Sequence, residues 1–383
     1  MNTLFLLPAW PTFIEVWTHR LIEHLEPEGV ILATFLPVEP LWHGRVPVVE
    51  VKEIPAPRWR RGLHRLGLPV DASPDFPSLT RVLESDSVSS VLVNYLTVAL
   101  QFKSVWEKTD KPLVVHCHGT DTTWDWRRPE SRESLRHKAA VRELSKRAIL
   151  IIGSKCGANR LLEIGVPNDR IVVKYLGVPV PRFPLEHPAR TKQIEVLYLG
   201  RFVDCKGPDL VIRAFELACE KGLDGRLTMA GDGPLFDLCR EIQLGSKFRD
   251  RINLLGAVDA TTGEQLRAQS DIFTAHNCLG RITHQEEVYG VSIVEAMAAS
   301  LPVVSGRSGG LIETVLHSVT GILIEPGDIE AHAAALLLLA ENPDLRYRMG
   351  IAGWQRAKDC FSLEQERLEL RQILGKDNSE TGG

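Results

Sequence analysis

The chain has 383 residues, of which 44% are hydrophobic and 25% are charged, and its formal net charge is −4. These values are ordinary for a soluble globular protein of two or three domains. No segment approaches 18 consecutive apolar residues, so no transmembrane helix is expected. The seven cysteines are scattered without a CxxC pair, which argues against a disulfide framework and favours a reducing cytoplasm.

Short apolar runs alternate with amphipathic helical patterns along the whole chain. The first run, MNTLFLLP, has no basic region ahead of it, so it predicts a strand and not a signal peptide. Continuous Val, Ile and Leu runs separated by helices are typical of parallel sheets covered on both faces. The first expected helix is residues 17–25, and the expected strands lie in residues 2–8, 29–37, 90–96, 111–119, 148–154, 194–201, 226–233, 251–258, 271–277, 301–306 and 321–327.

Two sets of alternating strands and helices indicate two doubly wound α/β domains. Between the two sets, prolines crowd into residues 179–188 and no periodicity survives. We expect one domain over residues 1–178 and a second over residues 190–355. Residues 356–383 are expected to form a helix that returns toward the first domain, followed by a frayed tail.

The charge is unevenly spread, with 23 basic and 20 acidic residues in the first 177 positions and 22 and 29 in the remainder. The basic excess includes Arg58–Gly67, where arginines alternate with Trp59, Leu63 and Leu66. This segment is either a solvated helix face or a patch that rests on an anionic membrane surface. The net charge of −4 lacks the basic excess of a nucleic-acid-binding protein, so nucleic acid is not an expected partner.

Arg201 and Lys206 follow an expected strand and flank a short loop before a helical pattern. In open α/β sheets, ligands bind beyond the carboxyl ends of the strands. Two cations at such a strand end and helix start suit a diphosphate, although two solvated loop charges would give the same pattern.

Glu287 and Glu295 are separated by seven residues at the start of another helical pattern. Glu287 precedes that helix, Glu295 lies about one turn into it, and both could face a ligand at its N-terminus. The backbone N–H groups of Gly290, Val291 and Ser292 would favour a phosphate there. A carboxylate accepts several hydrogen bonds, so Glu295 could bind a ribose diol and Glu287 a second sugar. A favourable charge at the helix N-terminus would explain Glu287 alone.

The HCHG stretch places His116 and His118 on one face of an expected strand. A zinc site needs three or four ligands, and no second pair has ligand spacing, so no metal site is expected. No G-x-G-x-x-G follows the first strand, which argues against a Rossmann dehydrogenase.

The order of motifs over about residues 195–330 resembles the retaining nucleotide-sugar glycosyltransferases of family 4, also called group 1. These motifs are GR…KG, AGDGP, E-x7-E-AMA, PVV…GG…E and GILIEPGD, and the chain is most similar to exopolysaccharide and colanic-acid-type members. The resemblance implies the GT-B fold, in which two Rossmann-like doubly wound domains face each other across a cleft. It also implies that residues 1–178 bind the acceptor and residues 190–355 the donor.

By the same resemblance, Arg201 and Lys206 hold the donor diphosphate, Glu295 binds the ribose, and Glu287 contacts the transferred sugar. VVHCHGTD is similar to the family's strand whose last histidine reaches the donor sugar, which is His118 here. The chain departs from the family at residues 8–17, where many members have a glycine pair, and at 176–177, where Asn-Gly is usual. The implied catalytic residues are Glu287, His118, Arg201 and Lys206, and the implied donor-binding residues are Arg201, Lys206, Glu287, Gly290, Val291, Ser292 and Glu295.

The implied reaction moves a hexosyl group from a nucleoside-diphosphate sugar to an acceptor hydroxyl with retention of configuration. The family mechanism is drawn as front-face attack, in which the leaving phosphate takes the acceptor proton. Because no DxD motif is evident, Arg201 and Lys206 are expected to replace a metal, and no cofactor is expected beside the nucleotide-sugar co-substrate.

The implied role is the synthesis of surface polysaccharide or glycolipid on a glycan or lipid-linked acceptor. We therefore expect a cytoplasmic protein that contacts the inner face of the plasma membrane through Arg58–Gly67. Two alternatives stay open, a catalytically inactive scaffold that binds a nucleotide sugar and a GT-B nucleotide-sugar epimerase.

Overall fold

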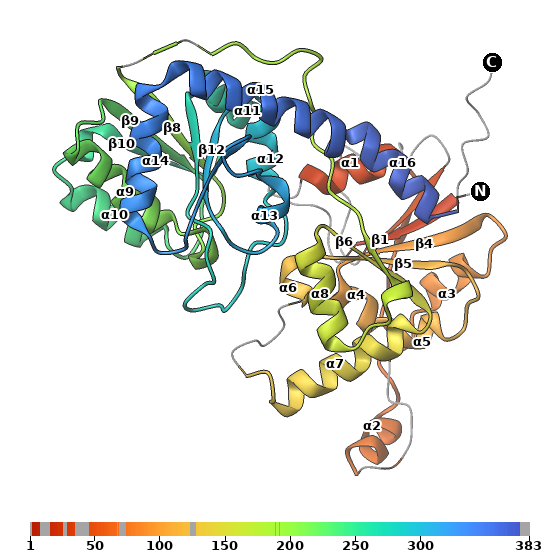
Figure 1. The fold of residues 1–383 in the computed structure, drawn as a ribbon. Coiled ribbons are helices and arrows are strands. Elements are labelled where there is room, and N and C mark those ends of the chain that lie inside the picture. Colours follow the sequence, from red (N-terminus) through yellow and green to blue (C-terminus); the bar gives the residue numbers. More distant parts are fainter. Residues whose placement is uncertain are drawn as a thin grey trace, which may run out of the picture.

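The computed structural model of the chain describes residues 2–7, 16–25, 29–34, 46–66, 68, 74–122, 128–187, 189–190 and 192–375. Within these residues the chain forms a seven-stranded and a six-stranded sheet, and every strand pair is parallel. The two sheets lie in separate lobes, each flanked by helices (Figure 1). This is the pair of doubly wound domains that the sequence predicts.

The first sheet has the strand order β3-β2-β1-β4-β5-β6-β7. Its strands are β1 Asn2–Leu6, β2 Val30–Thr34, β3 Val48–Glu50, β4 Val88–Asn94, β5 Leu113–Cys117, β6 Ala148–Ile152 and β7 Ile171–Val173. Its helices are α1 Val16–Leu25, α2 Arg58–Arg65, α3 Pro77–Leu83, α4 Leu96–Gln101, α5 Lys103–Trp106, α6 Gly119–Thr122, α7 Arg132–Ser145, α8 Lys155–Ile164 and the 3₁₀ turn η3 Asn168–Arg170.

The second sheet has the order β10-β9-β8-β11-β12-β13. Its strands are β8 Ile194–Leu199, β9 Gly225–Ala230, β10 Ile252–Gly256, β11 Ile272–Thr274, β12 Val303–Gly306 and β13 Gly321–Ile324. The helices that follow are α9 Pro208–Glu220, α10 Phe236–Gly245, α11 Ala260–Gln269, α12 Val291–Ala298, α13 Leu311–Thr314, α14 Ile329–Glu341, α15 Pro343–Cys360 and α16 Leu363–Ile373, with 3₁₀ turns η4 Asp204–Lys206 and η5 Arg249–Arg251.

In each sheet the strand order reverses direction once, between β1 and β4 and between β8 and β11. Such a switch point leaves a crevice at the carboxyl ends of the two strands, where α/β proteins bind ligands. The loops that follow β8 and β11 are therefore the expected place for a site in the second domain.

The strands form because they are short runs of Val, Ile and Leu that are buried on both faces. Each expected strand is present, and the structure adds β3 and β7, which the sequence does not predict. The domain limits at 178, 190 and 355 stay a prediction, and the expected frayed tail lies outside the described residues.

The last helix, α16, leaves the second lobe and packs on α1 of the first (Figure 1). Leu370 of this helix and Leu374 just after it are buried in the same cluster as Phe5 and Leu21. The first domain thus completes one face of its core with the end of the chain.

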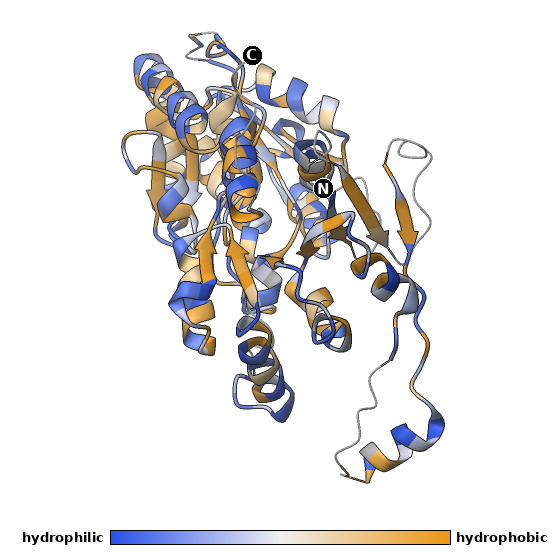
Figure 2. Cartoon of the chain, turned by 90° about the vertical axis from the view of Figure 1, so that its right-hand side faces the viewer, coloured by the Kyte–Doolittle hydropathy of each residue, from blue (hydrophilic) through white to orange (hydrophobic). Residues whose placement is uncertain are grey.

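Helix α2 stands at the end of an arm that extends away from the first lobe (Figures 1 and 2). Four arginines lie on this helix, Trp59 on it is 60% exposed, and Leu66 just beyond it is 78% exposed. Gly67, the last residue of the predicted basic patch, lies outside the described residues. No described helix is long and apolar enough to cross a membrane.

Candidate functional site

Lys206 and Glu287 meet at the switch point of the second sheet. Lys206 ends the turn η4 after β8, and Glu287 lies in the segment between β11 and α12. The Lys206 Nζ is 2.6 Å from Glu287 Oε2, and both side chains are less than one fifth exposed. The Gly290 N–H donates to Glu287 Oε1 at 3.1 Å. Glu287 thus caps the start of α12 and pairs with a cation at the same time.

Burial alone would raise the pKa of the Glu287 carboxyl, but the charge and hydrogen bond of Lys206 and the charge of Arg201 outweigh it. The pKa of Glu287 is therefore lowered from its ordinary value, and the carboxylate is ionised at neutral pH. An ionised carboxylate accepts hydrogen bonds only, which suits sugar hydroxyls.

Asp204 fastens the segment that carries Glu287 to the turn that carries Lys206. Its carboxylate accepts hydrogen bonds from the backbone N–H groups of Ile282 and Thr283, at 2.7 and 2.9 Å, and from the Thr283 hydroxyl at 2.8 Å. Burial raises the pKa of Asp204, but these hydrogen bonds outweigh it, so the net shift is downward. Asp204 therefore fixes the segment that carries Glu287 relative to the turn that carries Lys206.

The Gly309–Gly310 turn presses against the same segment from the end of β12. A Cβ on Gly310 would lie 1.7 Å from the carbonyl oxygen of Val288, and one on Gly309 would lie 2.0 Å from that of Glu287. Only glycine allows this approach of two backbones. The Gly310 N–H donates to the Glu287 carbonyl at 2.9 Å, so this N–H supports the site and is not open to a ligand.

Glu295 lies on α12 and is held by two arginines. Arg20 Nη2 is 3.0 Å from Glu295 Oε1, and Arg267 Nη1 is 3.2 Å from Glu295 Oε2. Arg267 comes from α11 of the same domain, whereas Arg20 comes from α1 of the first domain. The sequence gives no sign of either partner, because they lie 275 and 28 residues from Glu295.

Arg201 is exposed, and its guanidinium forms no ion pair within the described part of the chain. It lies near enough to Glu287 to lower the pKa of that carboxyl. The N–H groups of Val291 and Ser292 likewise have no acceptor among the described residues. The Gly290 N–H is predicted to bind a phosphate, but in the structure it donates a hydrogen bond to Glu287.

His118 follows β5 in the first domain. Its Nε2 lies 2.8 Å from Asn94 Oδ1, and its ring packs 4.5 Å from that of Tyr95, centroid to centroid. Burial, with a smaller effect of the Lys174 charge, lowers the pKa of His118 to about 3, so the imidazole is neutral. Asp121 accepts the His118 backbone N–H at 2.9 Å and the Leu96 N–H at 3.0 Å, which fixes the ends of β4 and β5 together.

The two domains also touch beside the site. Glu313 accepts the N–H groups of Lys155 and Cys156 at the start of α8, each at 2.8 Å. Arg160 of α8 forms an ion pair with Glu286, the residue before Glu287. The segment that carries Glu287 is therefore tied to the first domain as well as to its own.

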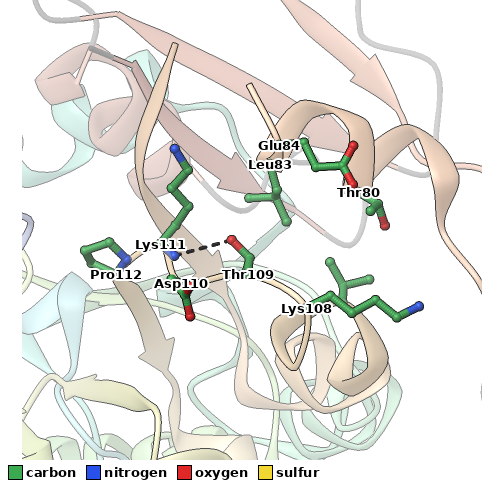
Figure 3. Close-up of a pocket in the computed structure, with 9 residues that line it drawn as sticks. Thr80, Leu83, Glu84, Lys108, Thr109, Asp110, Lys111 and Pro112 are labelled. Carbon is green, nitrogen blue, oxygen red and sulfur yellow. Dashed lines mark hydrogen bonds between the residues drawn. The ribbon is translucent and has the colours of Figure 1, made fainter. Parts of the chain in front are cut away.

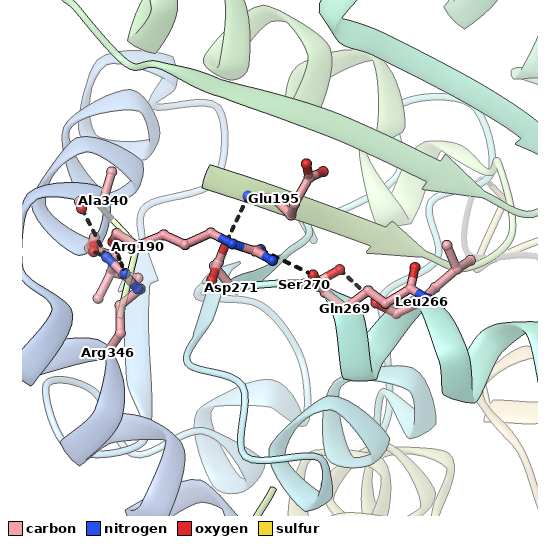
Figure 4. A network of polar contacts seen from close by, with 9 residues as sticks. Arg190, Glu195, Leu266, Gln269, Ser270, Asp271, Ala340 and Arg346 are labelled. Atoms are coloured by element: carbon pink, nitrogen blue, oxygen red, sulfur yellow. Dashed lines mark hydrogen bonds and ion pairs between the residues drawn. The ribbon is translucent and has the colours of Figure 1, made fainter. Parts of the chain in front are cut away.

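Two other polar regions lie at the amino ends of strands, away from the switch points. A cavity of about 390 Å³ is lined by residues such as Glu84, Lys108 and Asp110 (Figure 3). It lies beside the start of β5, at the end of the strands opposite to the switch point. In the second domain, Asp271 accepts from Arg190 at 3.1 Å and from the Glu195 N–H at 2.8 Å, which fastens the interdomain linker (Figure 4).

Two parallel-sheet domains of this topology, with cations and carboxylates gathered at a switch point, define a GT-B glycosyltransferase fold. Residues 181–356 match the protein family described as Glycosyl transferases group 1. The second domain therefore carries a region of the group 1 glycosyltransferase type.

Relatives by sequence include a GDP-mannose-dependent alpha-(1-6)-phosphatidylinositol monomannoside mannosyltransferase of Mycolicibacterium smegmatis. It is 27% identical over 272 residues, which cover 68% of this chain and 69% of that protein. The amylovoran biosynthesis glycosyltransferase AmsK of Erwinia amylovora is 27% identical over 234 residues, which cover 61% and 57%. The aligned part thus spans between 57% and 69% of the length of these two relatives.

The fold matches that of solved structures over almost the whole chain. The Anabaena protein HepE, solved with UDP and glucose, has a TM-score of 0.76 at 18% identity and covers 98% of this chain and 100% of its own. A sucrose-phosphate synthase from Thermosynechococcus elongatus has a TM-score of 0.73 at 17% identity and covers 98% of both chains. At these identities the likeness concerns the fold.

Proposed function

We propose that the protein transfers a hexosyl group from a nucleoside-diphosphate sugar to an acceptor hydroxyl with retention of configuration. The observation that carries this proposal is the Lys206–Glu287 pair at the β8–β11 switch point, with Arg201 exposed beside it. A cation and an ionised carboxylate side by side suit a ligand that has a diphosphate at one end and sugar hydroxyls at the other.

In this proposal the diphosphate lies against Arg201, Lys206 and the N–H groups of Val291 and Ser292. As the glycosidic bond breaks, negative charge grows on the leaving diphosphate, and fixed cations and the helix N-terminus stabilise it. Removing one such group commonly costs about 3 kcal/mol of transition-state stabilisation. These groups supply the positive charge for a reaction without a metal or another cofactor.

Glu287 would accept hydroxyls of the transferred sugar, and Glu295 those of the ribose. Neutral His118, fixed by Asn94, would contact the sugar from the first domain. The acceptor would bind to residues 1–178 and the donor to residues 190–355, so that sugar transfer takes place between the domains.

We also propose a lipid-linked or glycan acceptor in surface polysaccharide or glycolipid synthesis, because the named relatives include a phosphatidylinositol-mannoside and an exopolysaccharide enzyme. Helix α2 supports a contact with the inner face of the plasma membrane. It extends away from the body of the protein and combines four arginines with an exposed tryptophan (Figure 2).

The test is a thermal-shift panel of UDP-, GDP- and ADP-sugars, followed by product analysis with the donor that binds. A ligand at 100 times its Kd adds about 2.7 kcal/mol of stability, which shifts the melting temperature measurably. Transfer of the sugar from an α-linked donor into an α-linked product supports the proposal. Binding without turnover would favour an inactive scaffold, and a changed free sugar without an acceptor would favour an epimerase.

A further inference from the structure

Arg20 of the first domain forms a hydrogen-bonded ion pair with Glu295 of the second. Its Nη2 donates to Glu295 Oε1, and its Nη1 lies 3.5 Å from the carbonyl oxygen of Gly177, at the limit of a hydrogen bond. Gly177 lies at the end of the first domain, just before the proline-rich residues 179–188 that join the two domains. The guanidinium that α1 of the first domain carries therefore lies beside the start of the interdomain segment and is paired with a carboxylate of the second domain.

The Arg20, Glu295 and Arg267 side chains are 14%, 17% and 10% exposed, so this cluster is largely shielded from water. Two guanidinium groups against one carboxylate leave one positive charge without a partner in the cluster. Because little water screens this excess charge, it attracts an anion more strongly than an exposed charge would. The cluster is therefore favourable to an anionic ligand beside Glu295.

The two arginines occupy one acceptor position on each oxygen of Glu295. A carboxylate has about four such positions, so two remain for a pair of vicinal hydroxyls. A guanidinium holds a carboxylate in a fixed plane better than a single ammonium can. Arg20 and Arg267 thus fix the plane of the Glu295 carboxylate while occupying about half of its acceptor positions.

We propose that Arg20 is a positioning residue for ribose recognition, supplied by the first domain to a nucleotide site in the second. The inference rests on the proposed role of Glu295 at the ribose. Arg20 acts through Glu295, so its loss weakens the contact with the ribose hydroxyls. Because Arg20 belongs to the first domain, ribose recognition also depends on how the two domains are arranged. Arg267 lies in the same domain as Glu295 and adds no such dependence.

The experiment compares each ribonucleoside diphosphate with its 2′-deoxy form by calorimetry, with UDP and GDP as the probes. The wild type is expected to bind the ribonucleotide more tightly, because the deoxy form leaves an acceptor position of Glu295 unpaired. Arg20→Ala should weaken ribonucleotide binding by about tenfold, the size of one charge-assisted hydrogen bond, and change deoxynucleotide binding little. The ratio of the two affinities should therefore fall toward one.

Arg20→Lys is the conservative variant and should restore part of the ratio, because an ammonium keeps the charge without the planar fork. Arg81→Ala is the matched control, since Arg81 is an exposed arginine on α3 of the same domain. It should leave both affinities unchanged. Melting temperatures of all variants separate a lost contact from a lost fold.

The outcomes distinguish this inference from the proposed function. If the wild type discriminates and Arg20→Ala discriminates equally well, the role of Arg20 is overturned and the donor site stands. If the wild type binds both forms equally, Glu295 does not recognise the ribose, and the inference fails while the nucleotide site stands. If it binds neither form, the proposed nucleotide site is overturned, and the inference falls with it. An equal loss of both affinities in Arg20→Ala would show a general structural role and would also overturn it.

Discussion

Lys174 and Glu366 form an ion pair closed to solvent, with Nζ and Oε1 2.5 Å apart and both side chains no more than 2% exposed. Lys174 follows β7 of the first domain, and Glu366 lies on α16 near the end of the chain. Burial raises the pKa of Glu366, but the Lys174 charge and hydrogen bonds outweigh it, so the carboxyl is ionised at neutral pH. The pair therefore fixes α16 to the first domain.

Removing one partner of this pair should destabilise the protein strongly. Lys174→Met leaves a buried carboxylate without its cation, which commonly costs about 3–5 kcal/mol. The double variant Lys174→Met with Glu366→Leu should recover most of the loss, because two apolar groups can replace a buried pair. Urea unfolding of the wild type, the single variant and the double variant measures these changes in the free energy of unfolding. Lys52→Met in the exposed Lys52–Glu50 pair is the control and should change stability by less than about 1 kcal/mol.

Arg201→Ala and Lys206→Ala should each weaken the binding of the nucleoside diphosphate by about ten- to a hundredfold. The two variants should differ in stability. Lys206→Ala removes the ion pair of the partly buried Glu287 and should lower the melting temperature, whereas exposed Arg201 has no such partner. Calorimetry and thermal unfolding follow the two effects. Unchanged affinity in both variants would remove these cations from the site.

Glu295→Gln and Glu287→Gln should separate nucleotide binding from sugar transfer. Glu295→Gln is expected to lose affinity for the free nucleoside diphosphate, since its proposed partner is the ribose. Glu287→Gln should mainly lower turnover with the complete donor, since its proposed partner is the sugar. Calorimetry with the nucleotide and kinetics with the donor give the comparison. A larger loss of nucleotide affinity in Glu287→Gln would reverse the two assignments.

The pattern of motifs predicts Arg201, Lys206, Glu287 and Glu295, because these residues follow strands and the sheet brings strand ends together. It does not predict the side chains that hold them. Arg20 sits in an ordinary amphipathic helix, and nothing local links it to Glu295. Asp204 also has no local signal for its role, because the N–H groups of Ile282 and Thr283 that it accepts lie 78 and 79 residues away. The strands β3 and β7 have three residues each, too few for a periodic pattern.

The stability of the second domain should fall in mild acid because of two buried histidines. The Gly327 N–H donates to His276 Nε2 at 2.8 Å, so His276 is neutral and its Nδ1–H faces His332 Nδ1, also at 2.8 Å. Burial lowers the pKa of His276 from 6.5 to about 4, and burial lowers that of His332 well below 6.5. The unfolded chain therefore takes up protons first as the pH falls.

Stability is then complete above about pH 6.5 and decreases as the pH falls from there toward 4. Thermal unfolding at intervals between pH 7.5 and 4.5 measures the slope. The double variant His276→Gln with His332→Gln should show a shallower fall. His284→Gln, at an exposed histidine, should keep the slope of the wild type. An equally steep fall in the double variant would assign the effect to other groups.

Helix α2 should give weak, salt-dependent binding to anionic vesicles. Each arginine near an anionic surface contributes about 1 kcal/mol, and exposed Trp59 and Leu66 add apolar contact. Sedimentation with phosphatidylserine vesicles should show binding at low salt that decreases at high salt. Changing Arg58, Arg60 and Arg61 to Glu should abolish it. The control changes three exposed arginines of the second domain to Glu, Arg213, Arg240 and Arg348, and should leave the binding intact. If the wild type does not bind even at low salt, α2 is only a solvated surface.

The return of α16 to the first domain has a consequence for how the protein is made. Leu370 and Leu374 complete the cluster that contains Phe5, Leu7 and Leu21. A ribosome that adds about 5–20 residues per second needs roughly twenty to seventy seconds to pass from these first residues to the last ones. During that time the nascent first domain exposes an apolar strip that its own chain cannot yet cover. The nascent first domain is therefore expected to keep this strip exposed until α16 has been synthesised, although the folded protein buries every one of these side chains.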